Sequence, residues 1–63
     1  MSTMIASQSY NPETQELTVT FQSGHTYKYY SVPQDVANGF DNATSMGSYF
    51  LQNIKHLPFI KEE

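Results

Sequence analysis

The stretch from Leu17 to Tyr30, LTVTFQSGHTYKYY, constrains the fold of this chain more than any other. Leu17, Val19 and Phe21 alternate with polar residues, and a second alternating run follows Ser23-Gly24. Alternation with a period of two is typical of a strand with one buried face, and a short turn containing glycine joins two such strands. We therefore predict a β-hairpin, with the rest of the chain covering its apolar face.

The turn decides which face of the second strand is buried. A plain two-residue loop would bury Lys28 and direct Tyr27 and Tyr29 outward. A bulged turn with Gly24 in the left-handed region shifts the pairing by one residue, so that Tyr27 faces Val19 and Lys28 points to solvent. Because an unpaired buried charge is strongly unfavourable, we predict the bulged turn.

The segments around the hairpin give weaker signals. Met4 to Tyr10 alternates and is closed by Asn11-Pro12, which predicts a first strand followed by a turn. Phe59 to Glu63 is interpreted as a tail whose two apolar residues can dock on the domain while its acidic residues fray.

Two helices are expected between Pro33 and Pro58. Apolar residues at helical spacing predict the first over residues 34–42, where Gly39 makes the helix short or allows close packing. Thr44 or Ser45 caps the second, which continues to about His56. The predicted fold class is α+β, a three-stranded antiparallel β-meander followed by two short helices packed on one face, in the order β-β-β-α-α.

Length and composition limit the architecture. A chain of 63 residues forms one domain, with its core expected over about residues 4–59. It has no cysteine, which excludes disulfides and thiolate metal sites and favours a cytoplasmic protein. The thin apolar core makes a homodimer a reasonable way to bury more surface.

Charge argues against nucleic acid as the first partner. Three lysines face six acidic residues, and the net charge is −3, so the basic patch of a typical nucleic-acid binder is missing. No signal peptide is evident, and no apolar run approaches the roughly 20 residues that span a bilayer. We expect no membrane partner.

A series of short motifs runs along most of the chain: Ile5…Tyr10-Asn11, Leu17-Thr18-Val19-Thr20-Phe21, Gly24, Tyr27-Lys28-Tyr29, Val32-Pro33, Ala43-Thr44-Ser45-Met46-Gly47 and Tyr49-Phe50…Ile54-Lys55. In order and spacing they resemble the KTSC domain family, a small module found alone in bacterial and phage proteins and at the C-terminus of some lysyl-tRNA synthetases. The resemblance implies a Tyr-x-Tyr centre and a suggested association with RNA. Asn11 and Lys55 stand where the family usually has aspartate and arginine.

The candidate binding residues come mainly from the hairpin. Tyr27 and Tyr29 could stack on bases, but the register favours a core position for both. Lys28 and Tyr30, on the opposite parity, are the better candidates for an exposed contact patch. The remaining candidates are His25 and Lys55.

No chemistry emerges from these residues. His25 and His56 lack metal-ligand spacing, and Ser45 is interpreted as a helix cap rather than a nucleophile. We expect no enzyme activity, no cofactor and no metal.

Two functions remain open. The first is a protein-interaction or regulatory module with an unidentified protein partner, in the form of a phage-encoded inhibitor for example. The alternative is an RNA or single-stranded nucleic-acid binding domain.

Overall fold

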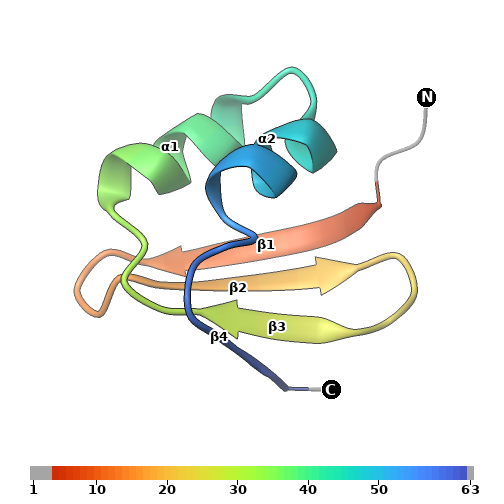
Figure 1. Cartoon of the computed structure of the whole chain (residues 1–63), viewed down its shortest axis with the longest axis horizontal. Coiled ribbons are helices and arrows are strands. Elements are labelled where there is room, and N and C mark those ends of the chain that lie inside the picture. The colour runs from red at the N-terminus through yellow and green to blue at the C-terminus, as the bar shows by residue number, and fades with distance from the viewer. Residues whose placement is uncertain (1–3, 63) are drawn as a thin grey trace.

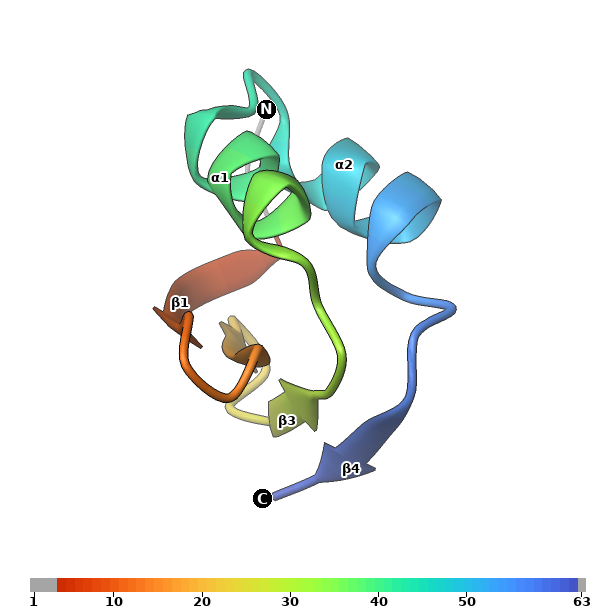
Figure 2. The same ribbon diagram turned by 90° about the vertical axis from the view of Figure 1, so that its left-hand side faces the viewer.

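The computed structural model describes residues 4–62 as a four-stranded antiparallel sheet with two helices on one face (Figure 1). Seen from the end of the sheet, α1 lies over β1 and α2 lies on the side of β4 (Figure 2). The predicted α+β meander with two helices on one face is therefore confirmed, and a fourth strand that the sequence analysis did not predict extends the sheet. In sheet order the strands are β1 (Ile5–Asn11), β2 (Glu16–Phe21), β3 (Thr26–Tyr29) and β4 (Phe59–Lys61), and the helices are α1 (Gln34–Asn42) and α2 (Met46–Asn53).

The hairpin between β2 and β3 has the predicted register. Val19 pairs with Tyr27, and Leu17 pairs with Tyr29. Gly24 has a φ of 96°, and its N–H donates to the Phe21 carbonyl, which closes the bulged turn. The left-handed conformation at Gly24 thus sets which side chains of β3 face the helices.

β1 contains an irregularity that simple alternation did not predict. Its pairing with β2 shifts between Ile5 and Ser7, so Ala6 is an extra residue in the ladder. The shift allows Ile5 and Tyr10 to face the helices, although they have opposite parity in the sequence. The Tyr10 hydroxyl donates to the Val32 carbonyl at 2.6 Å and so ties β1 to the connection between β3 and α1.

α1 has the predicted bounds, whereas α2 ends three residues earlier than predicted. Ser45 caps α2, because its hydroxyl oxygen accepts from the Ser48 N–H. The N–H groups of Ile54 and Lys55 both donate to the Phe50 carbonyl, and the second of these bonds spans five residues instead of the helical four, so the helix ends at Asn53. Within residues 4–62, neither helix has the length and apolar character that crossing a bilayer requires.

Phe59–Lys61 of the C-terminal segment form a strand, so the interpretation of this segment as a tail was wrong, although the Phe59 ring does dock, 5.3 Å from that of Tyr29. Glu63, the last acidic residue of that interpretation, lies outside the described residues. The chain turns back after α2, and Ile60 pairs with Lys28 while Phe59 pairs with Tyr29. Backbone pairing with a distant strand supplies order that the local sequence of three residues does not.

The core lies between the sheet and the helices. Phe50 is at its centre, and its ring meets those of Phe21 and Tyr29 edge to face, with centroids 5.4 and 5.5 Å away. Edge-to-face contacts of this kind stabilise aromatic pairs beyond their buried area. The buried apolar residues are Ile5, Leu17, Val19, Tyr29, Val32, Ala37, Phe40, Phe50 and Ile54.

Candidate functional site

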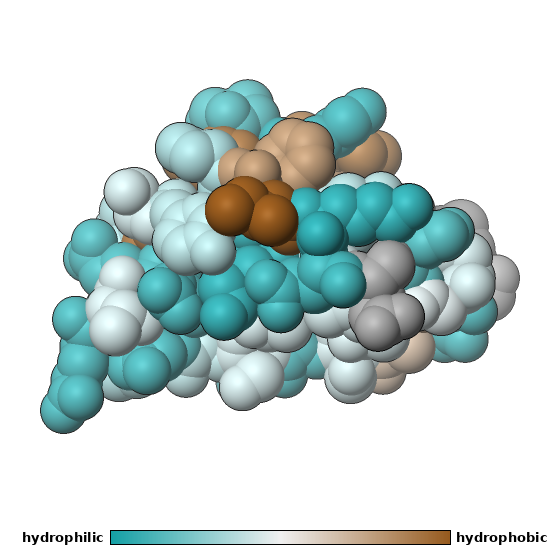
Figure 3. Space-filling model, turned by 90° about the horizontal axis from the view of Figure 1, so that it is seen from below, coloured by the Kyte–Doolittle hydropathy of each residue, from teal (hydrophilic) through white to brown (hydrophobic). Residues whose placement is uncertain are grey.

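The face of the sheet opposite the helices is the candidate binding surface. We call it the open face. Figure 3 shows the molecule from below as mainly hydrophilic, with one strongly hydrophobic group near its centre. The strand registers place three rows of side chains across it, and they explain this character: Ser7, Thr20 and Thr26; Ser9, Thr18, Lys28 and Ile60; and Asn11 with Glu16.

Lys28 lies in the middle row of the open face, as predicted. Its ammonium group is 3.6 Å from a carboxylate oxygen of Glu16, and both side chains are about one third exposed. An ion pair at this exposure contributes little to stability, so Lys28 is placed for contact more than for folding. On the next row, the hydroxyls of Thr20 and Thr26 are 3.2 Å apart.

Tyr30 follows β3 and borders the same surface. Its N–H donates to the Pro58 carbonyl at 2.8 Å, so the pairing of β3 with the C-terminal segment continues for one residue beyond the strand. Alternation along the strand then gives Tyr30 the parity of Lys28 and places both on the open face. The structure thus brings together the two residues that the sequence favoured as an exposed patch.

Tyr27 and Tyr29 face the helices and do not belong to the open face. Tyr29 is 3% exposed, and its ring lies 5.5 Å from that of Phe50. Tyr27 is half-buried between Phe21 and Phe59, with ring centroids 5.4 and 5.6 Å away. A base-stacking role for this pair would require the aromatic cluster to open.

His25 and Lys55 lie apart from Lys28 and Tyr30. His25 is exposed at the end of the hairpin turn, where its carbonyl accepts from the Phe21 N–H. Lys55 is exposed in the connection between α2 and β4. Within residues 4–62, no three side chains of histidine, cysteine, aspartate or glutamate lie close enough to hold a metal ion.

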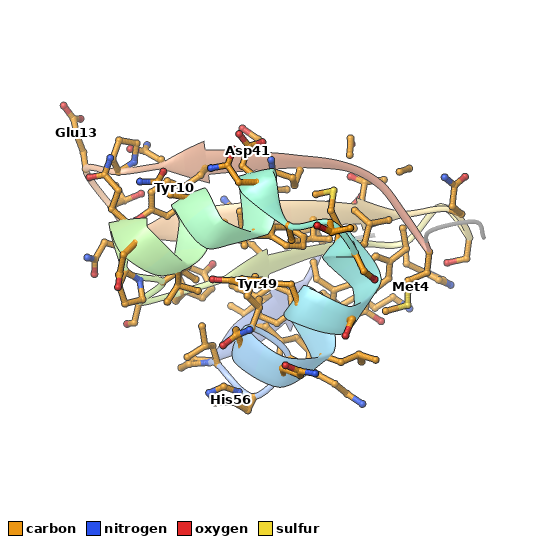
Figure 4. All side chains as sticks on the ribbon, turned by 90° about the horizontal axis from the view of Figure 1, so that it is seen from above. Met4, Tyr10, Glu13, Asp41, Tyr49 and His56 are labelled. Carbon is orange, nitrogen blue, oxygen red and sulfur yellow. The ribbon has the colours of Figure 1, made fainter. Side chains whose placement is uncertain are left out.

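The lysines lie toward one side of the molecule, but carboxylates lie there too. All three lysines belong to β3, β4 or the connection between α2 and β4, which are Lys28, Lys61 and Lys55. Glu13 and Asp41 lie on the side of β1, whereas His56 lies on the side of α2 and β4 (Figure 4). Glu62 directly follows β4 and Glu16 is ion-paired with Lys28, so basic and acidic groups are mixed around the lysines.

Ile60 and Phe59 are the residues of this region that sequence reasoning missed. They are 56% and 51% exposed. The available signal was the pair of adjacent apolar residues after Pro58, which the sequence analysis expected to dock but did not include among the candidate binding residues.

Burial of Tyr29 makes a pH-dependent prediction. Desolvation raises the pKa of its hydroxyl above the ordinary value of about 10, and Tyr27 nearby raises it further. The Tyr29 hydroxyl therefore loses its proton at a lower pH in the unfolded chain than in the folded one. Its contribution to the free energy of unfolding is complete below about pH 10 and is lost as the pH rises further. We expect the urea midpoint to fall above that pH, and to fall less in Tyr29→Phe. An equal decline in both proteins would contradict the assignment, and Tyr30→Phe is the control that should retain the full decline.

Comparison with known proteins places this architecture among described domains. The model of the KTSC domain family matches residues 1–59. The crystal structure of a KTSC domain protein from Yersinia pestis superimposes with a TM-score of 0.88 at 32% identity, over 100% of this chain and 92% of that one.

Similar sequences occur both in a small protein and in much larger ones. The chain is 50% identical over 46 residues to a lysine–tRNA ligase from Nostoc sp., which covers 73% of the chain. It spans only 8% of the length of that ligase. It is also 41% identical over 54 residues to an uncharacterised protein from Stutzerimonas stutzeri, covering 86% of the chain and 76% of that protein.

Proposed function

The chain belongs to the KTSC domain family, and we propose that it is a non-catalytic binding module whose open face contacts a partner protein. The observation that supports the proposal is the position of Lys28 on a sheet face that the helices leave uncovered, with Tyr30 assigned to the same face by alternation along the strand. A charged and an aromatic side chain on a rigid sheet suit recognition, because little conformational entropy is lost when they bind.

We propose no catalytic role, because the carboxylate and hydroxyl groups that could act in catalysis have structural roles. Asp41 accepts a hydrogen bond from the Gln8 side chain at 3.0 Å, and the Ser45 hydroxyl caps α2. Tyr49 donates to the Val36 carbonyl at 2.9 Å and thereby joins the two helices. These bonds hold the scaffold on which the open face is displayed.

Protein recognition is favoured over base stacking by the orientation of the aromatic residues. Sheets that bind single strands expose several aromatic rings on the binding face. Here Tyr27 and Tyr29 face the helices, which leaves Tyr30 as the aromatic residue that alternation assigns to the open face among residues 4–62. One aromatic ring beside one ion-paired lysine is a small contact surface for nucleic acid.

A photoreactive residue tests the proposal directly. With p-benzoylphenylalanine in place of Tyr30, we expect irradiation in an extract of the native host to give a defined protein adduct, identified by mass spectrometry. The same group in place of Asn38, exposed on α1, should not give that adduct. Lys28→Glu, combined with the probe at Tyr30, should weaken the adduct several-fold while the fold is retained, because the Lys28 ion pair contributes at most about 1 kcal/mol to stability. Equal labelling from both positions would contradict an open-face site.

RNA binding is the second candidate, favoured by two observations. Relatives that share half of the aligned residues are lysine–tRNA ligases, and the three lysines of this chain lie on one side of the molecule. Titration with total tRNA at low salt should then shift the amide resonances of Lys28, Tyr30 and Lys61, and added salt should reverse the shifts. Unchanged spectra would remove this candidate and leave the protein-binding proposal standing.

A further inference from the structure

β4 is an edge strand whose backbone is available on its outer side. Tyr30 donates to the Pro58 carbonyl, Glu62 donates to the Thr26 carbonyl at 2.7 Å, and Ile60 pairs with Lys28. In an antiparallel ladder, alternate residues bond to the neighbouring strand and those between them point the other way. The N–H and C=O groups of Phe59 and Lys61 therefore point toward the free edge.

Exposed apolar side chains gather along the same side of the molecule. Among residues 4–62, three of the four exposed large hydrophobic residues belong to α2 or β4: Leu51, Phe59 and Ile60. Tyr49 contacts α1, and Leu51 lies about 200° further around the helix axis, on the side of α2 away from α1. α2 itself lies on the side of the molecule that carries β4 (Figure 2). The edge therefore carries an exposed apolar side chain on each face of the sheet, Phe59 on the helix side and Ile60 on the open face. Unpaired backbone groups beside exposed apolar side chains can pair with another chain, whereas the short length of β4 and the charge of Lys61 limit the strength of such pairing.

We propose that a second copy of this chain pairs with β4 in antiparallel orientation, with Ile60 opposite Ile60 of the second copy. In this register Phe59 pairs with Lys61 of the second copy and Lys61 pairs with its Phe59. Both pairs use the backbone groups that point toward the free edge. The two sheets then form one continuous eight-stranded sheet with all four helices on the same face.

Charge and hydrogen bonding select this register over its neighbours. Pairing centred on Lys61 would place two ammonium groups opposite each other, which is destabilising. Pairing centred on Phe59 would use one pair of outward-pointing residues instead of two. With Ile60 at the centre, each Lys61 lies beside an aromatic ring of the other copy, where a cation is favoured.

Buried area sets the expected strength of the dimer. A stable interface buries at least about 1,200 Å² in total, which a three-residue strand cannot supply alone. The symmetry axis runs perpendicular to the sheet, so the two α2 helices approach each other on the helix side and Leu51 adds to the contact. We expect a weak dimer that is populated between micromolar and millimolar concentrations. It would place both Lys28 side chains on one continuous open face.

The sequence contains no cysteine, so a single introduced cysteine can report the register between the two β4 strands by disulfide formation. Ile60→Cys should form a disulfide-linked dimer rapidly under mild oxidation with diamide, because opposed residues in a non-hydrogen-bonded pair have Cα atoms about 4.5 Å apart. Thr20→Cys, on the same face but in an inner strand, is the matched control and should react far more slowly. Equal rates for the two variants would overturn the proposed pairing.

The unmodified chain provides an independent readout. Sedimentation equilibrium should show a mass that rises with concentration from 7.2 kDa toward twice that value, and Ile60→Lys should remain monomeric at every concentration. A wild-type chain that stays monomeric at millimolar concentration would also overturn the proposal. The photoreactive group at Tyr30 reports on a different protein adduct, so failure of the dimer and failure of the proposed function are distinguishable.

Discussion

Replacing Phe40 with alanine is expected to unfold most of the chain at room temperature. Phe40 is completely buried, and its ring lies 6.1 Å from that of Tyr49 and 6.4 Å from that of Phe50. Removing such a ring costs about 3–5 kcal/mol, through lost transfer free energy and the cavity left behind. A single core in a chain shorter than about 70 residues rarely supplies more than about 3–5 kcal/mol of stability, so the loss is as large as the whole.

Circular dichroism and urea titration check this expectation. Phe40→Ala should lose most of its helical signal without denaturant, whereas Phe40→Leu should fold with a lower urea midpoint, because it retains part of the volume. Leu51→Ala is the matched control, since Leu51 is half-exposed on the neighbouring helix and its truncation should barely change the midpoint. A Phe40→Ala protein with the wild-type midpoint would contradict the position of Phe40 as a fully packed residue of the core.

The hairpin could be predicted from sequence because its signals are local and agree with one another. The charge of Lys28 and the conformational freedom of Gly24 both favour the bulged register, and each concerns residues a few positions apart. Their agreement fixed the faces of Tyr27 and Tyr29 as well. Consistency between turn chemistry and side-chain polarity is the property that makes a short segment predictable.

β4 could not be predicted because its order comes from a distant partner. Phe59, Ile60 and Lys61 form a strand only where β3 offers its free edge, and three residues are too few to show a period. The bulge at Ala6 was not predicted for a related reason, since an extra residue can be recognised only from its pairing with the neighbouring strand.

The omission of β4 affected the candidate site. Lys28 and Tyr30 were identified from the sequence, whereas Ile60, which pairs with Lys28, was not.

Gly39 of α1 lies against the Tyr49 side chain of α2, and the sequence analysis left two interpretations of this glycine open, a short helix or close packing. The structure supports the second. A Cβ atom added at Gly39 would lie 2.8 Å from Cζ and 3.0 Å from Cε2 of Tyr49, closer than non-bonded carbons allow. The ring cannot move away freely, because its hydroxyl donates to the Val36 carbonyl and its face stacks on Phe40 (Figure 4).

Gly39→Ala is therefore expected to destabilise the protein, although alanine is the better helix former. Overpacking costs about 1–3 kcal/mol, whereas replacing a helical glycine gains at most about 1 kcal/mol, so the net loss reaches up to about 2 kcal/mol. Gly47→Ala is the matched control in α2. Its added Cβ would lie 3.9 Å from the nearest atoms, those of Met4, so we expect the same substitution to stabilise there. In a Tyr49→Leu background the ring is gone, and Gly39→Ala should become neutral or stabilising in urea titrations. If Gly39→Ala lowered the midpoint equally in both backgrounds, its effect would come from the helix backbone and not from the contact between the helices.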